Sequence, residues 1–493
     1  MMEVAEGRGK LAWGDFSLYP RSFYLILAAF FVLAALARVL RTGTLETDEM
    51  QQVLHYLSLE WGYGSQPPLY EWLQAAVFRI TGPSVAGLAV LKYGLLFLST
   101  VLIAAAVNLH TDERSAGFLG AFSLFSMPTF FLMSQRDLTH TVVAIACVAL
   151  FFWSLFSAIR NPTIPRYLLV GVAIGLGAIS KYNFVVIPAA ALIVLVAMNA
   201  FRSRVLDWRI VATLAVAAAI ALPHALWLLQ NLDVASAQTL HEMEIKEDVG
   251  RFWGFVATSA SFATAVLKAS SPVLGFFFVL FARNARTIVR ASNPSTQLVG
   301  WTFVVSLVLV YLTVVAIGAT EVRQKWLAIY FVALPLYLTL KIAAAGIDVR
   351  PRLRPAAVIS GTLFLGVSAM LVGKDLVAPA LGWSDKAEMP YAGLAAALET
   401  ELGGPPAVIV TREPALAANL LLQFPTAEII TQESGPLAPL AAPAVFVATS
   451  DKASADLSGL RSDAATAALQ AIEIPDGPPT ATKHMFYYSR LSH

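Results

Sequence analysis

Long runs of apolar residues recur along most of the chain, separated by short polar segments. A helix needs roughly 20 apolar residues to cross a bilayer, and many of these runs approach that length. We therefore expect about eleven membrane-spanning helices. The predicted spans are 21–40, 86–107, 116–133, 138–158, 167–180, 184–200, 210–230, 270–283, 298–318, 326–345 and 356–373. Because Lys268 interrupts an apolar stretch, 251–268 is expected to lie along the interface, before a short spanning helix.

The composition supports a chain that is embedded in lipid. Hydrophobic residues make up 57% of the 493 positions and charged residues only 13%. Soluble domains carry roughly a quarter charged residues. The net charge of +2 offers no electrostatic field for nucleic acid. Cys147 is the single cysteine, so no intrachain disulfide is expected.

The distribution of basic residues predicts an orientation. With residues 1–20 in the cytoplasm, the cytoplasmic loops carry twelve basic residues in forty positions, and the opposite loops carry eight in eighty. Positive residues collect on the cytoplasmic side of membrane proteins. The first outer loop, 41–85, and everything after residue 373 are then expected outside. The first apolar run is interpreted as a retained helix and not as a signal peptide.

Residues 374–493 differ in character from the membrane domain, 21–373. Pro and Gly separate short segments there; Ala407–Thr411 and Ala444–Thr449 are predicted strands, and Pro414–Phe424 a helix between them. We expect a small α/β domain outside the membrane. It contains no catalytic motif, so an accessory lid or docking role is favoured over catalysis.

The first outer loop contains the most informative polar residues. Asp48 and Glu49 follow the first span, and a Gln66-Pro67-Pro68-Leu69-Tyr70 turn comes about twenty residues later. Apolar positions predict an amphipathic helix from Thr47 and a second one after Pro68, both lying on the membrane surface. Carboxylates at the rim of a membrane domain are costly without a function. The simpler alternative is that Asp48 only caps its helix.

Other charged residues on the predicted outer side favour chemistry. They are Arg136, Asp137, Lys181, Arg323 and Lys325. Cations hold and neutralise a phosphate leaving group, and a carboxylate removes a proton from an attacking hydroxyl. The aromatic residues Trp61 and Tyr63 offer a stacking face for a sugar ring, or alternatively anchor the loop at the interface.

These features resemble the polytopic glycosyltransferases that use polyprenyl-phosphate sugars, a superfamily with a C-type fold. Its members include the protein O-mannosyltransferases and the lipid A aminoarabinose transferases. The chain looks most similar to lipopolysaccharide-modifying members such as the rhizobial galacturonosyltransferases. The match rests on the acidic pair, the Gln-Pro-Pro-Leu-Tyr turn, Asp137 and the Lys325-Trp326 step, and covers roughly residues 20–345.

The resemblance implies roles for individual residues. The catalytic group is then Asp48, with Glu49 adjacent and Asp137 as a second acid. The outer-side cations Lys181, Arg323, Lys325 and Arg136 are expected to bind the donor phosphate. The substrate loop contains Trp61, Tyr63, Gln66, Pro67, Pro68 and Tyr70. Gln66 stands where the aminoarabinose branch commonly has Lys, which puts transfer of aminoarabinose in doubt.

The expected reaction is an inverting transfer of a sugar from a polyprenyl phosphate to a hydroxyl or phosphate of an envelope glycolipid. Its expected place is the outer face of the bacterial inner membrane. Protein O-mannosylation differs only in the acceptor and stays open. A transporter of lipid-linked sugars is less favoured, because no inverted repeat is visible; a scaffold would not explain the acidic first loop. No cofactor is firmly implied, although the acidic loop 242–248 permits a divalent cation.

Overall fold

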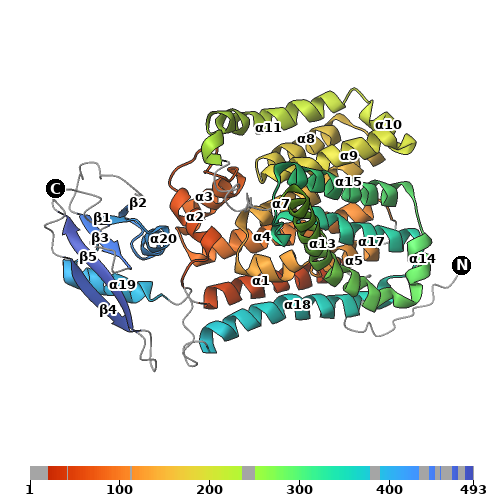
Figure 1. Cartoon of the computed structure of the whole chain (residues 1–493). Coiled ribbons are helices and arrows are strands. Elements are labelled where there is room, and N and C mark those ends of the chain that lie inside the picture. The colour runs from red at the N-terminus through yellow and green to blue at the C-terminus, as the bar shows by residue number, and fades with distance from the viewer. Residues whose placement is uncertain are drawn as a thin grey trace, which may run out of the picture.

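A computed structural model describes residues 20–41, 43–111, 114–235, 250–377, 389–431, 444–449, 456, 469–475 and 483–491. The chain forms a large helical bundle and a small mixed α/β domain beside one end of it (Figure 1). The predicted fold class, an all-α polytopic membrane domain with a small C-terminal α/β domain, is confirmed.

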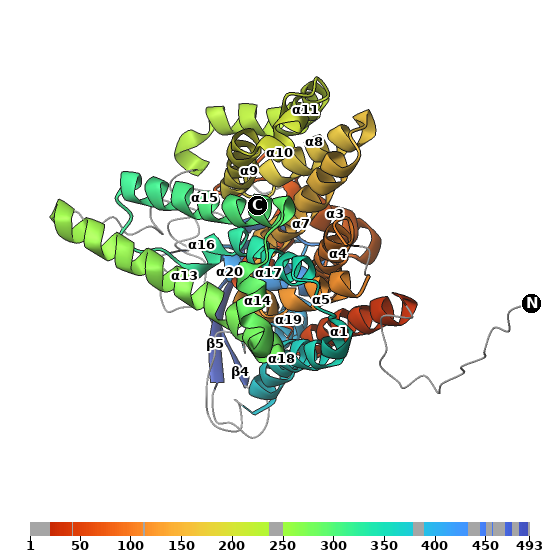
Figure 2. The same ribbon diagram turned by 90° about the vertical axis from the view of Figure 1, so that its right-hand side faces the viewer.

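Helices account for nearly all of the bundle. The longer helices are α1 (Pro20–Leu40), α3 (Leu69–Thr81), α4 (Val85–Asn108), α5 (Arg114–Leu124), α7 (Thr139–Arg160), α8 (Ile164–Ala178), α9 (Val186–Ala197), α11 (Ile210–Gln230), α13 (Arg251–Phe281), α15 (Pro294–Ile317), α17 (Ala333–Ala344) and α18 (Arg350–Val377). The short helices are α2 (Thr47–His55), η1 (Thr129–Met133), α6 (Ser134–Arg136), η2 (Tyr182–Val185), α10 (Asn199–Val205), η3 (Ala282–Asn284), α14 (Ala285–Arg290), α16 (Gln324–Leu327) and η4 (Tyr330–Val332). Figure 2 shows α8, α9, α10 and α11 together at one side of the bundle, where α11 packs on α8.

Seven helices in the described residues are long and apolar enough to cross a membrane, or nine if each of two bent pairs is one span. The predicted count of about eleven is not confirmed. Ile164–Ala178 and Tyr330–Ala344, which correspond to two predicted spans, are shorter apolar helices. The predicted interfacial segment 251–268 is wrong, since α13 runs unbroken for 31 residues despite Pro272 inside it. Neighbouring helices commonly allow membrane helices to tolerate proline.

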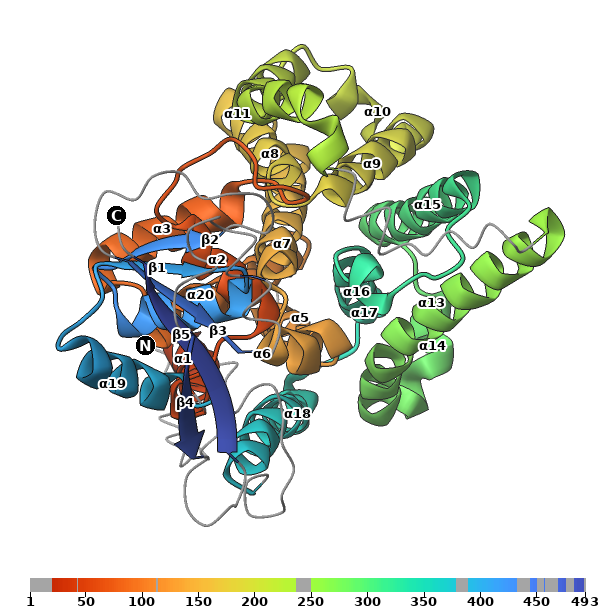
Figure 3. The ribbon, with the colours of Figure 1, turned by 60° about the vertical axis from the view of Figure 1, so that its left-hand side comes forward.

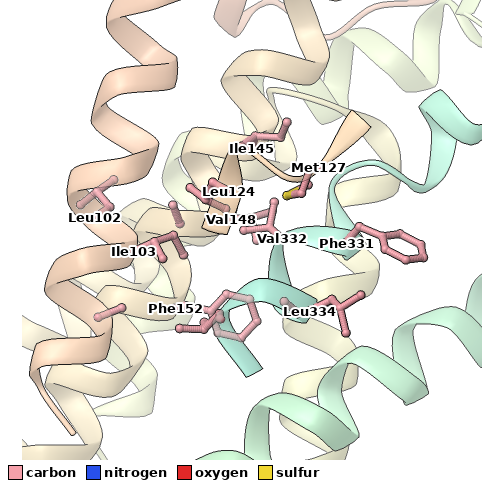
Figure 4. Packing of buried hydrophobic residues seen from close by; sticks show 14 of the residues in the cluster. Leu102, Ile103, Leu124, Met127, Ile145, Val148, Phe152, Phe331, Val332 and Leu334 are labelled. Carbon is pink, nitrogen blue, oxygen red and sulfur yellow. The ribbon is translucent and has the colours of Figure 1, made fainter. Parts of the chain in front are cut away.

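The centre of the bundle is a continuous apolar core. Figure 4 shows Leu102 and Ile103 of α4 in the same packed cluster as Val148 and Phe152 of α7 and Val332. These five side chains are almost completely buried. Because side-chain packing and not water exclusion drives association inside a bilayer, this close contact is what fixes α4 against α7.

The two predicted amphipathic helices of the first loop are confirmed as α2 and α3. Their orientation differs from that of a helix on a soluble protein. On α3 the buried face carries Tyr70, Glu71 and Gln74, whereas Ile80 is 87% exposed. An apolar stripe facing outward is stable where the surrounding solvent is lipid. The face of α3 that is turned into the protein thus carries Glu71 and Gln74 beside apolar residues such as Phe78.

The C-terminal domain contains a five-stranded sheet of order β2-β1-β3-β5-β4. The strands are β1 (Val408–Thr411), β2 (Glu428–Thr431), β3 (Ala444–Ala448), β4 (Gln470–Pro475) and β5 (Lys483–Leu491), and the helices are α19 (Tyr391–Leu402) and α20 (Pro414–Gln423). β1 is parallel to β2 and β3, and β5 is antiparallel to β3 and β4. The predicted strands near 407 and 444 and the helix between them are confirmed.

The two parts of the molecule meet at α2, which lies between the bundle and α20 (Figure 3). Val53 of α2 and Leu45 before it are buried against Ala418 and Leu421 of α20. The buried amide of Asn419 accepts a hydrogen bond from the Leu45 N–H at 3.1 Å. The C-terminal domain is therefore joined directly to the helix that carries the acidic pair.

Candidate active site

Asp48 and Asp137 meet at the N-terminal ends of two helices. The backbone N–H of Asp48 donates to Oδ1 of Asp137 over 3.0 Å. Oδ2 of Asp48 in turn accepts from the N–H groups of Leu138 and Thr139, each at 3.1 Å. The first N–H groups of a helix have no partner within it, and they favour negative charge. Asp137 therefore binds the start of α2, which contains Asp48, and Asp48 binds the start of α7, which follows Asp137.

The idea that Asp48 only caps its own helix is wrong. Glu46 is the N-cap of α2, in a capping box with Glu49. Leu138 has φ of 73°, the left-handed region that a non-glycine residue rarely adopts. This turn directs two consecutive N–H groups at one carboxylate oxygen. A strained backbone held beside an acidic group is typical of a functional site.

Asp137 has an unusual protonation equilibrium. Burial and the nearby charge of Asp48 raise the pKa of Asp137 to about 7, against the opposing effects of Lys92 and the N–H of Asp48. Its carboxyl group therefore exchanges a proton close to neutral pH. Perturbed carboxyl groups of this kind cluster at functional sites.

Glu49 lies on the other face of α2, 1% exposed, in a buried ion-pair network. Its carboxylate contacts Nη2 of Arg38 at 2.5 Å and Nζ of Lys92 at 3.3 Å. Burial alone would raise the pKa of Glu49, but Lys92 and Arg38 hold it well below the ordinary value. With both oxygens occupied, Glu49 is placed to anchor α2 and not to receive a proton.

A second polar cluster lies beside Asp48. Oε1 of Glu71 is 3.1 Å from Nε2 of His140, 4.0 Å from Nδ1 of His55, and accepts from Nε2 of Gln52 at 3.3 Å. Burial alone would raise the pKa of Glu71, but the charge of the adjacent His140 holds it at about 2. Because His140 directly follows Thr139, this cluster and the Asp48 carboxylate share the first turn of α7.

The loop that leads to α3 is held in one shape by a tight turn. Tyr63 and Gln66 exchange both backbone hydrogen bonds at 3.0 Å, with Gly64 at φ of 57° between them. The hydroxyl of Tyr63 donates to the Ser58 carbonyl at 2.6 Å. Pro67 and Pro68 then lead into α3, and both are buried. The predicted substrate loop is therefore held together by hydrogen bonds of its own.

Trp61 fastens this loop to α11. Its carbonyl oxygen is 2.5 Å from Nδ1 of His224. The His224 ring stacks between the rings of Tyr182 and Trp227, at centroid distances of 5.6 and 5.9 Å. A groove of about 370 Å³ opens beside them. It is lined by Trp61, Leu222, Pro223, Leu226, Trp227 and Gln230.

The predicted phosphate-binding cations do not all lie together. Lys181 donates to Oγ1 of Thr141, next to His140, at 2.7 Å. Its neighbour Asn183 donates to the Trp326 carbonyl at 2.9 Å, which links the Lys181 turn to the segment that carries Lys325.

The other two predicted cations are less buried. Arg323 pairs with Glu321 at 3.5 Å, with 38% of its side chain exposed. Arg136 precedes Asp137 but has an exposed side chain. Of the four predicted cations, Lys181 is therefore the one that contacts the first turn of α7, beside the polar cluster. The acidic loop 242–248 lies outside the described residues, within which no group of three His, Cys, Asp or Glu side chains is arranged to hold a metal ion.

Sequence reasoning did not identify several residues of this region. Arg38, Glu71, Lys92 and His140 are all buried beneath the first loop. One signal was available, because a charge inside a spanning helix, such as Lys92 in α4, normally marks a buried partner. The sequence gives no such signal for Glu71, because the apolar residues that define the amphipathic pattern of α3 lie on the opposite face of the helix.

Comparison with known proteins finds relatives that match most of the chain. Residues 65–227 match the family model described as dolichyl-phosphate-mannose-protein mannosyltransferase. The chain is 33% identical over 410 residues to the lipopolysaccharide core galacturonosyltransferase RgtB of Rhizobium johnstonii, covering 83% of both chains. It is also 33% identical to RgtA of that organism, covering 82% of this chain and 81% of RgtA.

The fold has a counterpart among solved structures. The chain resembles ArnT from Cupriavidus metallidurans, crystallised with undecaprenyl phosphate, with a TM-score of 0.60 and 12% identity; the match covers 94% of this chain and 97% of ArnT. The structural likeness concerns the fold alone, and the sequence identity to the two Rhizobium proteins establishes kinship. The chain therefore belongs to the family of these polytopic membrane glycosyltransferases, and it is a glycosyltransferase.

Proposed function

We propose that the chain transfers a sugar from a polyprenyl-phosphate donor to a hydroxyl group of an envelope glycolipid, at the outer face of the inner membrane. The observation that carries this proposal is the Asp48 carboxylate, held by the N–H groups of Leu138 and Thr139 beside Asp137. A base fixed by backbone contacts keeps its geometry through the reaction, which is what proton abstraction needs.

In the proposed reaction, Asp48 takes the proton from the acceptor hydroxyl as its oxygen attacks the anomeric carbon. The bond from that carbon to the phosphate oxygen breaks on the opposite face, so the configuration inverts. The polyprenyl phosphate leaves as an anion that cations stabilise. Lys181, which donates to Thr141 in the first turn of α7, is proposed as the main phosphate-binding cation, and Arg323, Lys325 and Arg136 are proposed to assist.

The position of Lys181 also suggests where the donor lipid lies. Its neighbour Tyr182 stacks on His224, which stacks on Trp227 at the wall of the 370 Å³ groove. The stacked rings thus connect Lys181 to this groove. An isoprenoid chain that leaves a phosphate at Lys181 would find an apolar groove beyond the stack. We propose this groove, beside the Trp61 loop, as the start of that path.

The kinship suggests the sugar and the acceptor. RgtA and RgtB are named as galacturonosyltransferases of the lipopolysaccharide core. We propose galacturonic acid, or a related uronic acid, as the transferred sugar, and the lipopolysaccharide core or lipid A as the acceptor. Protein O-mannosylation is the second candidate, because the family model that matches residues 65–227 carries that description.

The test is to delete the gene and record mass spectra of the envelope glycolipids, then restore wild type or Asp48→Asn. Loss of one sugar mass, recovered by wild type only, is expected. A positioned base typically contributes about 10²–10⁴-fold, so Asp48→Asn should nearly abolish transfer. Glycolipids that stay unchanged while glycoproteins lose a hexose would favour the second candidate. Full activity of Asp48→Asn would disprove the assigned base.

A further inference from the structure

The buried face of α3 carries more hydrogen-bonding groups than the described residues satisfy. Gln74 is completely buried, yet neither its amide oxygen nor its amide nitrogen has a partner among them. The Tyr70 hydroxyl, Oε2 of Glu71, Oε1 of Gln52, Oγ1 of Thr139 and Nδ1 of His140 share this condition. Each belongs to a side chain with at most 4% exposure. Six side chains from α2, α3 and the start of α7 are involved.

Such groups are rare in folded proteins. Nearly all buried polar side-chain atoms are hydrogen-bonded to protein or water, because an unpaired one costs the full free energy of desolvation. One unpaired atom has little meaning, whereas a cluster on three adjoining elements is accounted for by a common occupant. That occupant has to be small, polar and able both to donate and to accept, as water and sugar hydroxyls are.

The cluster adjoins the proposed base. Thr139 supplies one of the N–H groups that bind Asp48, and His140 follows it. Tyr70 is 5.8 Å from the His140 ring, measured between centroids. Burial and the charges of Glu49, Asp48 and Glu71 raise the pKa of Tyr70 well above its ordinary value, so its hydroxyl stays protonated as a donor. Gln74 follows Tyr70 by one helical turn on the same face of α3.

We propose that Gln52, Tyr70, Glu71, Gln74, Thr139 and His140 bind the hydroxyl groups of the sugar that is transferred. This inference rests on the proposed function and adds the site that recognises the sugar. Gln74 is the specificity-determining residue, because neither its amide oxygen nor its amide nitrogen has a hydrogen-bond partner among the described residues.

The charge of Glu71 also sets how the sugar lies. Its free Oε2 accepts from a hydroxyl and repels a second carboxylate. A uronic acid therefore binds with its hydroxyl edge toward Glu71 and its own carboxylate on the other side. The part of the sugar that this site binds is therefore the neutral edge of a pyranose ring, which carries hydroxyl groups.

The test compares two probes on the full-length protein: polyprenyl phosphate alone, and polyprenyl phosphate carrying galacturonic acid. Gln74→Leu should weaken binding of the sugar-bearing probe about tenfold for each lost hydrogen bond. Binding of the sugar-free probe should stay within about twofold, and Tm should be unchanged or higher, since an apolar isostere removes an unpaired group. Gln74→Met is the second variant if Gln74→Leu does not fold.

Gln135 supplies the matched control. It is also a buried glutamine, but its Nε2 donates to the Phe131 and Phe364 carbonyls at 2.6 and 2.8 Å, and its Oε1 accepts from Ser368. Gln135→Leu should therefore lower Tm. Equal losses of Tm in both variants, or equal weakening of both probes by Gln74→Leu, would overturn the inference. A wild-type protein that binds both probes equally and transfers no sugar would instead refute the proposed function.

Discussion

Asp137 binds the N-terminal backbone of α2, which contains Asp48, and Asp48 binds the N-terminal backbone of α7, which follows Asp137. Asp137 accepts the N–H of Asp48, while Asp48 accepts the N–H groups of Leu138 and Thr139. Two acidic side chains therefore lie close together although like charges repel. The helix N-termini offset that repulsion, and the raised pKa of Asp137 relieves the rest. Asp48 and Asp137 therefore hold two helices together and also supply the acidic groups of the proposed site.

Because Asp48 both caps α7 and is the proposed base, Asp48→Asn and Asp48→Ala should differ in thermal stability although both lose activity. Asp48→Asn keeps an oxygen for the N–H groups of α7 and should fold normally with little activity. Asp48→Ala also leaves these N–H groups without a cap, which costs about 0.5–2 kcal/mol. Thermal unfolding of the detergent-purified proteins measures the difference. Equal Tm for both variants would show that the cap contributes nothing.

Asp137 predicts a pH dependence of stability. Its folded-state pKa of about 7 exceeds the ordinary value of 3.8, so between these values the folded state binds more protons than the unfolded state. The stabilisation is fully present below the lower value and is lost as the pH rises through about 7.

The matched variant for this dependence is Asp137→Asn, which keeps an oxygen for the Asp48 N–H. Wild-type Tm minus variant Tm should fall as the pH rises from 4 to 8, and the decline should concentrate below about 7. A difference that does not change with pH would contradict the raised pKa.

Removal of the charge of Glu49 should lower the stability of the protein. Glu49→Gln leaves Arg38 and Lys92 buried beside a neutral group, and breaking a buried ion pair typically costs about 3–5 kcal/mol. Glu46→Gln is the control, because its side chain is 28% exposed and pairs only with the neighbouring Arg41 among the described ion pairs. Thermal unfolding of both variants is the measurement. A Glu49→Gln protein of normal Tm without activity would instead support the predicted catalytic role of Glu49.

The contact between Asn419 and Leu45 predicts that the C-terminal domain affects catalysis. Asn419→Ala removes the acceptor for the Leu45 N–H, just before α2, and should lower kcat more than it raises KM. Asn419→Asp keeps an acceptor oxygen and should recover most of the activity. Gln423→Ala, at an exposed position of the same helix, is the control and should have no effect. Equal activity of all three variants would show that this contact does not position Asp48.

The sequence predicted which segments are helices better than it predicted how they face. In α3 the apolar stripe was correctly identified, but periodicity alone does not say which face is buried when the solvent is lipid, and the buried face holds Glu71 and Gln74. The ion pairs of Glu49 were not predictable, because Arg38 and Lys92 come from two other helices. The strands near Val408 and Ala444 were predictable from local turn residues and alternating apolar positions.

The hydrogen bond between Leu45 and Asn419 joins segments of the chain that are synthesised at very different times. The two residues are 374 positions apart, so a ribosome adding about 5–20 residues per second needs roughly 20–75 s to travel between them. During that interval the first loop is already synthesised while its partner helix does not yet exist. A nascent or truncated chain therefore lacks the support of the segment around Asp48, and maturation of the enzyme is completed by its last-made domain.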